Sequence, residues 1–159
     1  MKKMNKKGFT LIELLAIIVI LAIIAVITVP VILGIIDEAK AKSAVSSVVG
    51  YGKAVELAYS HYQLGTDATL VNASGDLTNG AYLNLTLGTA STDTAIKLRV
   101  DFSGDKVVCG TAAAENTVAG GKIKLTKCKI GGTGSEYTYD NGRACLSSAY
   151  NATTGCPAS

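Results

Sequence analysis

An uncharged apolar run of 23 residues, from Leu14 to Ile36, limits what this chain can fold into. As an α-helix the run would be about 35 Å long, and the hydrocarbon core of a bilayer is about 30 Å thick. A conventional secretory signal has a shorter apolar region that ends in a small-residue cleavage site, and no such site follows Ile36. The run therefore predicts a membrane-spanning helix.

A carboxylate stands at the front of the apolar run, because Glu13 directly precedes Leu14. A charged side chain at membrane depth costs at least a few kcal/mol unless it is paired, so an ionisable residue there is a candidate for function. Residues 1–8 hold four lysines and no acid: Lys2, Lys3, Lys6 and Lys7. By the positive-inside rule these lysines should keep the N-terminus in the cytoplasm.

The stretch from Lys6 to Glu13, KKGFTLIE, together with the apolar run resembles the class III leader and N-terminal segment of type IV pilins and type II secretion pseudopilins. The resemblance covers roughly residues 1–40. It implies that a membrane-embedded aspartyl prepilin peptidase removes the leader, residues 1–8, by cutting between Gly8 and Phe9, and then methylates Phe9. It also implies that Phe9, Glu13 and Pro30 act in assembly, with helicity lost near Pro30 when subunits pack into a filament.

The net charge of the chain depends on this leader. The full sequence has a formal charge of +3, with 15 basic and 12 acidic side chains. Loss of the four leader lysines would leave 11 basic and 12 acidic side chains, a charge of −1. Overall basicity is therefore no evidence for nucleic acid as a partner. A solvated strand face with edge-blocking lysines explains Lys122, Lys124, Lys127 and Lys129, and phosphate binding is the alternative.

A helical pattern continues beyond the apolar run, from Asp37 to Leu64, with small and apolar residues at three-and-four spacing on one face. We expect one helix over residues 9–64, transmembrane or in the filament core over 9–36 and amphipathic over 37–64. Gly50 and Gly52 each weaken a helix by about 1 kcal/mol, so a bend there is conceivable.

The remaining residues, 65–159, predict a small β-rich head. Alternating apolar residues indicate strands around 83–87, 96–102, 107–109 and 122–125, and Ser103–Asp105 suggests a hairpin turn. The amphipathic half of the helix would cover the apolar face of the sheet. We therefore predict an α+β fold, a long helix packed on a small antiparallel sheet, as in the pilin fold. Residues 131–159 are turn-rich, with few apolar residues and a tight turn at Asp140-Asn-Gly.

Four cysteines all follow the membrane segment: Cys109, Cys128, Cys145 and Cys156. That side of the membrane is oxidising, so an even number of cysteines indicates disulfides, and buried free thiols are the alternative. The spacing alone leaves three connectivities open. The resemblance implies that Cys145 and Cys156 bound a disulfide-tied C-terminal region, which leaves Cys109 for Cys128. With no C-x-x-C motif and His61 as the one histidine, we expect no metal site.

Enzymatic activity has no support in the sequence, because no nucleophile–base pair and no phosphate-binding loop can be named. We expect no catalytic residue and no cofactor. The resemblance implies a structural subunit of a type IV pilus serving adhesion, motility, aggregation or DNA uptake. Its partners would be other pilin subunits, prepilin peptidase and a pilus assembly platform, in the cytoplasmic membrane first and in a surface pilus later. The alternatives are a pseudopilin of a secretion or competence system and a non-polymerising anchored domain, which the intact Gly8-Phe9 and Glu13 argue against.

Overall fold

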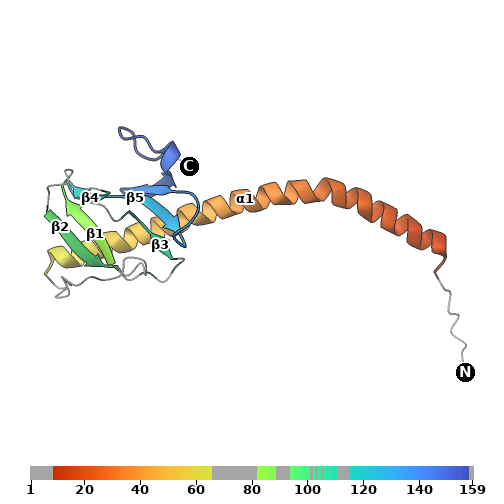
Figure 1. Ribbon diagram of the computed structural model, residues 1–159, viewed down its shortest axis with the longest axis horizontal. Coiled ribbons are helices and arrows are strands. Elements are labelled where there is room, and N and C mark those ends of the chain that lie inside the picture. The colour runs from red at the N-terminus through yellow and green to blue at the C-terminus, as the bar shows by residue number, and fades with distance from the viewer. Residues whose placement is uncertain are drawn as a thin grey trace, which may run out of the picture. The chain divides into compact units, whose positions relative to one another are not determined.

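The computed structural model describes residues 9–65, 82–88, 94–100, 102, 104, 106–110 and 115–157. The predicted leader with Gly8 lies outside these residues. The chain divides into two compact units, Met1–Ala41 and Lys42–Ser159, which we describe separately. Helix α1, Leu11–Gln63, runs through both of them (Figure 1). The α+β architecture predicted from the sequence is confirmed by this helix and the sheet that follows it.

The first unit is the exposed part of α1. Every described side chain from Phe9 to Ala41 is exposed, and the helix continues without interruption through Pro30. By its length and apolar composition, α1 is able to cross a membrane. Exposed apolar side chains on all sides of a helix need a solvent other than water, and lipid or other apolar helices can supply it.

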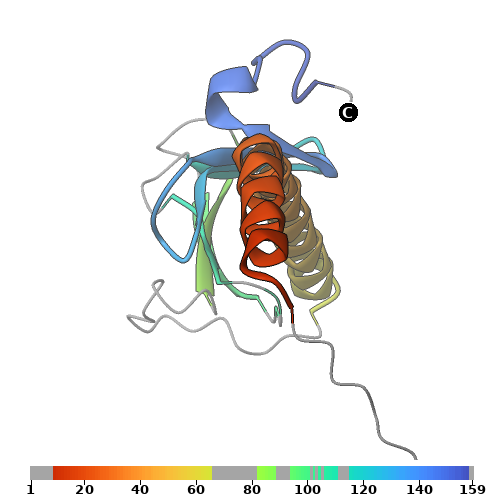
Figure 2. The same ribbon diagram turned by 90° about the vertical axis from the view of Figure 1, so that its right-hand side faces the viewer.

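In the second unit the last part of α1 packs on the sheet (Figures 1 and 2). The helix residues that are fully buried there are spaced three or four apart, as one helical face requires: Val48, Tyr51, Gly52 and Val55. They join a core whose sheet side is formed by apolar residues such as Leu85, Leu98, Leu125 and Tyr139. This packing is the cover that the amphipathic pattern predicted.

The sheet has the strand order β2-β1-β4-β5-β6-β7, and β3 pairs with β5. The strands are β1 Tyr82–Leu87, β2 Thr94–Arg99, β3 Val107–Val108, β4 Asn116–Ala119, β5 Lys122–Ile130, β6 Tyr137–Asp140 and β7 Arg143–Leu146. β6 lies along one edge of β5. On its opposite edge, β4 pairs with the first half of β5 and β3 with its end.

The sheet is mostly antiparallel, as the sequence predicted, and contains one parallel pair that the sequence did not predict. β1 and β4 are parallel, with Thr86 opposite Thr117 and Leu87 opposite Val118, and the other described pairs are antiparallel. The alternation of apolar residues reveals which side chains face the core. It does not reveal the direction of the neighbouring strand. The same alternation would therefore be seen whether β4 ran parallel or antiparallel to β1.

The hairpin turn predicted around Gly104 lies largely outside the described residues, and the described strands on either side of it pair with other strands. Within the described residues, β2 pairs with β1, and β3 pairs with the end of β5. Ser103 and Asp105 themselves lie outside the described residues. The partner of β3 is more than twenty positions away in the sequence, and a local turn signal carries no information about such a distant pairing.

The C-terminal stretch contributes more to the core than its composition suggested. β6 and β7 form a hairpin around Asn141 and Gly142, whose φ angles are 47° and 90°. Positive φ at both positions is what a two-residue turn of type I′ requires, and Asn-Gly is its preferred sequence. Tyr137 and Tyr139 on β6 are both buried. The turn was predicted correctly. The two strands beside it were missed because their aromatic and threonine residues, which favour strands, lie in a stretch whose many glycines indicate turns.

Gly52 has a packing role that helix propensity alone does not reveal. A Cβ atom at this position would lie 2.3 Å from Cε2 of Tyr139, so glycine allows the tyrosine ring to lie directly on the helix. The Tyr139 hydroxyl donates a hydrogen bond to Oε1 of Glu56 at 2.6 Å. Burial raises the pKa of the Tyr139 hydroxyl, and the hydrogen bond to Glu56 raises it further. The helix stays continuous here because these contacts with β6 offset the weak propensity of glycine.

Candidate processing and assembly segment

The N-terminal end of α1 is the segment that the sequence marked for processing. Phe9 precedes the helix and is 81% exposed. The carbonyl oxygen of Thr10 accepts a hydrogen bond from the backbone N–H of Leu14 at 3.3 Å. A residue that lies outside the helix while its carbonyl accepts such a bond occupies the N-cap position. Thr10 is therefore the N-cap of α1.

Thr10 and Glu13 bind each other reciprocally. The backbone N–H and the hydroxyl of Thr10 both donate to Oε2 of Glu13, at 2.8 and 2.7 Å. In return the backbone N–H of Glu13 donates to Oγ1 of Thr10 at 3.4 Å. This arrangement is a capping box, which satisfies backbone donors that the first turn of a helix otherwise leaves unpaired.

Sequence reasoning missed the role of Thr10, although its signal was present. Thr10-Leu-Ile-Glu13 ahead of an apolar run fits the capping-box pattern. From the sequence, Glu13 was interpreted as a charge at membrane depth and, by the resemblance, as an assembly residue. The structure adds a local reason for a carboxylate at this position, which is to fix where the helix begins.

The apolar part of α1 departs from regular helical hydrogen bonding around Pro30. Proline has no backbone N–H, so it cannot donate to the carbonyl four residues earlier. Two residues earlier, the hydroxyl of Thr28 donates to the carbonyl oxygen of Ile24 at 3.0 Å. Such back-bonding slightly weakens and often bends a helix. The loss of helicity near Pro30 on assembly stays a prediction.

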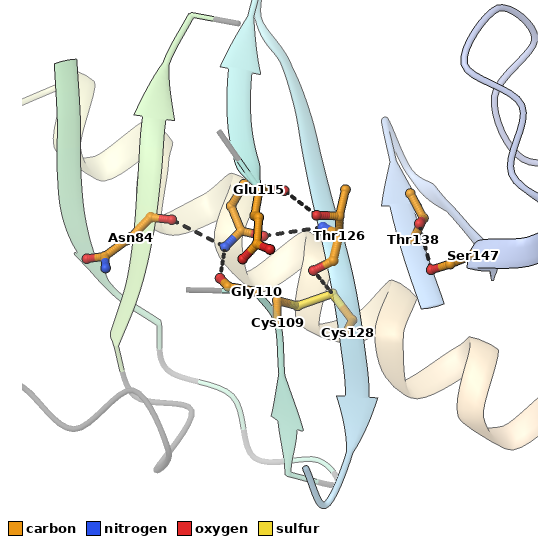
Figure 3. The surroundings of a disulfide bond; sticks show 9 residues. Asn84, Cys109, Gly110, Glu115, Thr126, Cys128, Thr138 and Ser147 are labelled. Carbon is orange, nitrogen blue, oxygen red and sulfur yellow. Dashed lines mark hydrogen bonds between the residues drawn. A yellow bond between two sulfur atoms is a disulfide. The ribbon is translucent and has the colours of Figure 1, made fainter. Parts of the chain in front are cut away.

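Two disulfides join the four cysteines, Cys109 to Cys128 and Cys145 to Cys156. These are the pairs that the resemblance implied. Figure 3 shows the first pair at the edge of β5, just beyond the bulge between Leu125 and Cys128. The second pair links β7 to the end of the chain and encloses a short 3₁₀ helix, Ser147–Ala149.

Buried Asn116 organises the region around the first disulfide. Its side-chain amide donates to the carbonyl oxygens of Gly110 and Asn84, and its Oδ1 accepts from the backbone N–H of Thr126. Figure 3 labels its partners Asn84, Gly110 and Thr126. A buried amide with all these partners fixes the strands next to β5, because an unpaired polar group there would be costly. Its role is structural.

The C-terminal loop has noncovalent ties to the sheet besides its disulfide. The hydroxyl of Tyr150 donates to Oδ2 of Asp140 at 3.0 Å. The ammonium of Lys124 lies 4.6 Å from the centre of the Tyr150 ring, within the range of a cation–π interaction. The tail is therefore held by more than the disulfide, which the sequence analysis did not anticipate.

These ties lead to a prediction for a variant in which both Cys145 and Cys156 are replaced by Ser. Closing a loop of this length restricts the unfolded chain, which stabilises by roughly 3 kcal/mol. We expect residues 147–157 to become protease-sensitive in the variant, while β6 stays protected by Tyr139. Limited proteolysis with mass spectrometry measures this, and Tyr150→Phe, which keeps the disulfide, serves as the milder control. A tail as resistant as in the unchanged protein would contradict the prediction. Non-reducing peptide mapping of the unchanged protein that recovers Cys145 linked to Cys109 or Cys128 would contradict the pairing.

Three lysines of β5 have local partners. Lys127 pairs with Glu115, and Nζ of Lys129 lies 3.2 Å from Oε1 of Glu136. The hydrogen bond and the charge of Glu115 raise the pKa of Lys127. Lys124 lies over Tyr150, as described above. These contacts favour the interpretation of the lysines as a solvated strand face and give no support to nucleic-acid binding.

Comparison with known proteins identifies the N-terminal segment. Residues 3–29 match the family model described as the prokaryotic N-terminal methylation motif. The match includes Gly8, Phe9, Thr10 and Glu13 and ends just before Pro30. The chain thus carries the type IV prepilin-like signal, a signal typical of structural pilin-type proteins rather than of an enzyme family. No curated protein and no solved structure matches the chain.

Proposed function

We propose that this chain is the precursor of a type IV pilus subunit, a pilin that is processed at the membrane and then polymerises. The observation that carries the proposal is the methylation motif at residues 3–29. The exposed apolar helix behind the motif supports it, since such a surface needs lipid before assembly and other apolar helices afterwards. The head, with two disulfides, suits an oxidising exterior.

Processing in this proposal has two chemical steps. Water first hydrolyses the peptide bond between Gly8 and Phe9, leaving a carboxylate on Gly8 and a free amine on Phe9. The amine of Phe9 then takes a methyl group from a sulfonium methyl donor and releases a proton. Prepilin peptidase would perform both steps, as the motif implies, and this chain would be the substrate. The exposure of Phe9, outside the helix, supports access to this position.

Assembly in this proposal depends on Glu13 and the new N-terminus. Within a filament the carboxylate of Glu13 would neutralise the ammonium of Phe9 on an adjacent subunit. This pairing would fix the axial register, because a misplaced subunit would leave two charges unpaired among apolar helices. The assembly platform, the surface location of the pilus, and its role in adhesion, motility, aggregation or DNA uptake belong to the same proposal.

Intact-mass measurement tests the processing step. We expect the mature protein to lack residues 1–8 and to carry one additional methyl group. Gly8→Leu should leave the precursor uncut, because glycine lets the extended backbone approach a peptidase cleft closely. A mature protein that begins at any residue other than Phe9 would overturn the proposed function.

The alternative function is a pseudopilin that forms a short fibre for secretion or transformation. The methylation motif fits both functions equally, and the two disulfides give only a slight preference for a pilin. Shearing filaments from cells and identifying the dominant protein by mass spectrometry separates the two. Abundance in the sheared fraction supports the pilin, and absence from it together with a secretion or transformation defect in a deletion strain supports the pseudopilin.

A further inference from the structure

The start of α1 is fixed by two side chains immediately beside the bond that processing would cleave. Phe9 contributes the amine side of that bond, and Thr10 is the N-cap. The chain described is the uncut precursor sequence, so the cap between Thr10 and Glu13 belongs to the form that a peptidase would meet. The methylation motif, an independent observation, marks this same stretch as a substrate for processing.

We propose that Thr10 is a positioning residue for cleavage between Gly8 and Phe9, an inference that rests on the proposed function. With Glu13 it makes the helix begin at Leu11 and so holds Phe9 outside the helix. A peptide bond within a helix has its N–H and C=O engaged and its backbone coiled, whereas residues before the N-cap make no intrahelical bonds. The cap thereby keeps the amine side of the scissile bond accessible to the peptidase.

The length and composition of the helix explain why a cap is needed at this point. The residues after Thr10 are helical without interruption as far as Gln63, and the run from Leu14 to Ile36 is uncharged and apolar. Helix ends otherwise fray or shift by one or two residues. Without a cap the first turn would sample several starting points, and only some of them would present Phe9 correctly. The hydroxyl of Thr10 and the carboxylate of Glu13 select one.

The capping role of Glu13 is separable from its proposed role in assembly. The cap requires an oxygen acceptor at Oε2, which receives two hydrogen bonds from Thr10. Glutamine supplies an equivalent oxygen and serves in capping boxes as glutamate does. Register in the filament instead requires the negative charge. Glu13→Gln should therefore preserve cleavage, while Thr10→Val, which retains the charge and the shape, should impair it.

Steady-state cleavage kinetics test the proposal, with full-length precursor in detergent micelles and purified prepilin peptidase. We expect Thr10→Val to raise KM about fivefold, the factor that the usual cost of a lost cap predicts. kcat should change less than twofold, because the variant lowers only the fraction of substrate in the competent conformation. Thr10→Ser and Glu13→Gln should have the KM of the unchanged precursor. Thr28→Val, the same substitution farther along α1, is the matched control and should also behave as the unchanged precursor.

Each other outcome overturns the proposal in a recognisable way. An unchanged KM for Thr10→Val would show that the cap does not position the bond. A loss in Thr10→Ser or Glu13→Gln as large as in Thr10→Val would show that the cause is not the capping oxygen. A fall in kcat at constant KM would place Thr10 in contact with the reacting atoms. If the unchanged precursor is not cut after Gly8, the proposed function itself fails, whereas all the other results leave it intact.

Discussion

Glu13→Val is expected to abolish filament assembly while leaving cleavage and membrane insertion in place. The substitution removes the charge that would pair with the ammonium of Phe9 on a neighbouring subunit. Leaving one partner of a buried ion pair uncompensated costs roughly 3 kcal/mol or more, which is over about a hundredfold in the equilibrium for adding each subunit. Cleavage continues, with a KM raised by the loss of the Oε2 acceptor, because the hydroxyl of Thr10 still accepts from the backbone N–H of residue 13. The measurement is the amount of sheared filament per amount of mature protein in the membrane.

Two further variants identify the property of Glu13 that matters for assembly. Glu13→Gln keeps the capping oxygen and loses the charge, so it should assemble as poorly as Glu13→Val. Asp37→Asn removes a charge from an exposed side chain of the same helix and should assemble normally. Normal filament yield from Glu13→Gln would show that the carboxylate does not set the register and would leave the processing proposal untouched.

The N-terminal half of the molecule was largely predictable because its signals are local. The apolar run requires a helix wherever it lies, and its continuation at three-and-four spacing correctly indicated a buried face including Val48 and Val55. The capping box was equally local and was missed only because Glu13 already had another explanation. Charge at membrane depth and helix capping are compatible, and Glu13 combines both properties.

The head was less predictable because its structure depends on partners distant in sequence. The alternation in β1 and β5 revealed strands, but the parallel pairing of Thr86 with Thr117 depends on a chain crossing that no local pattern records. The buried tyrosines of β6 were missed for a related reason. Tyr139 is buried because Gly52, 87 positions earlier, has no side chain. Taken alone, a tyrosine in a turn-rich stretch is typical of a surface, and a glycine in a helix is typical of a weak point.

The contact between Gly52 and Tyr139 gives the second large expected effect. Helix propensity predicts that replacing Gly52 by Ala stabilises the head, whereas packing predicts that it destabilises it. By propensity alone, Gly52→Ala would stabilise α1 by about 1 kcal/mol. The new Cβ would instead overlap the Tyr139 ring at 2.3 Å. Overpacking costs about 1–3 kcal/mol, and losing the hydrogen bond between Tyr139 and Glu56 adds about 1–3 kcal/mol. We expect Gly52→Ala to lower the free energy of unfolding of the head by about 2 kcal/mol and Gly52→Val by about 4 kcal/mol.

Guanidinium unfolding of the full-length protein in micelles, followed by the near-ultraviolet circular dichroism of its tyrosines, measures these changes. Gly50→Ala is the matched control, since its Cβ would lie 3.2 Å from the half-buried ring of Phe102, a far milder approach than the one at Gly52. We expect that variant to remain within about 0.5 kcal/mol of the unchanged protein. Tyr139→Leu should cost less in the Gly52→Ala background than alone, because the two residues are in contact and their effects are not additive. Additive effects, or a more stable Gly52→Ala, would show that the ring does not depend on the missing side chain. The glycine would then be only the weak point that propensity predicts.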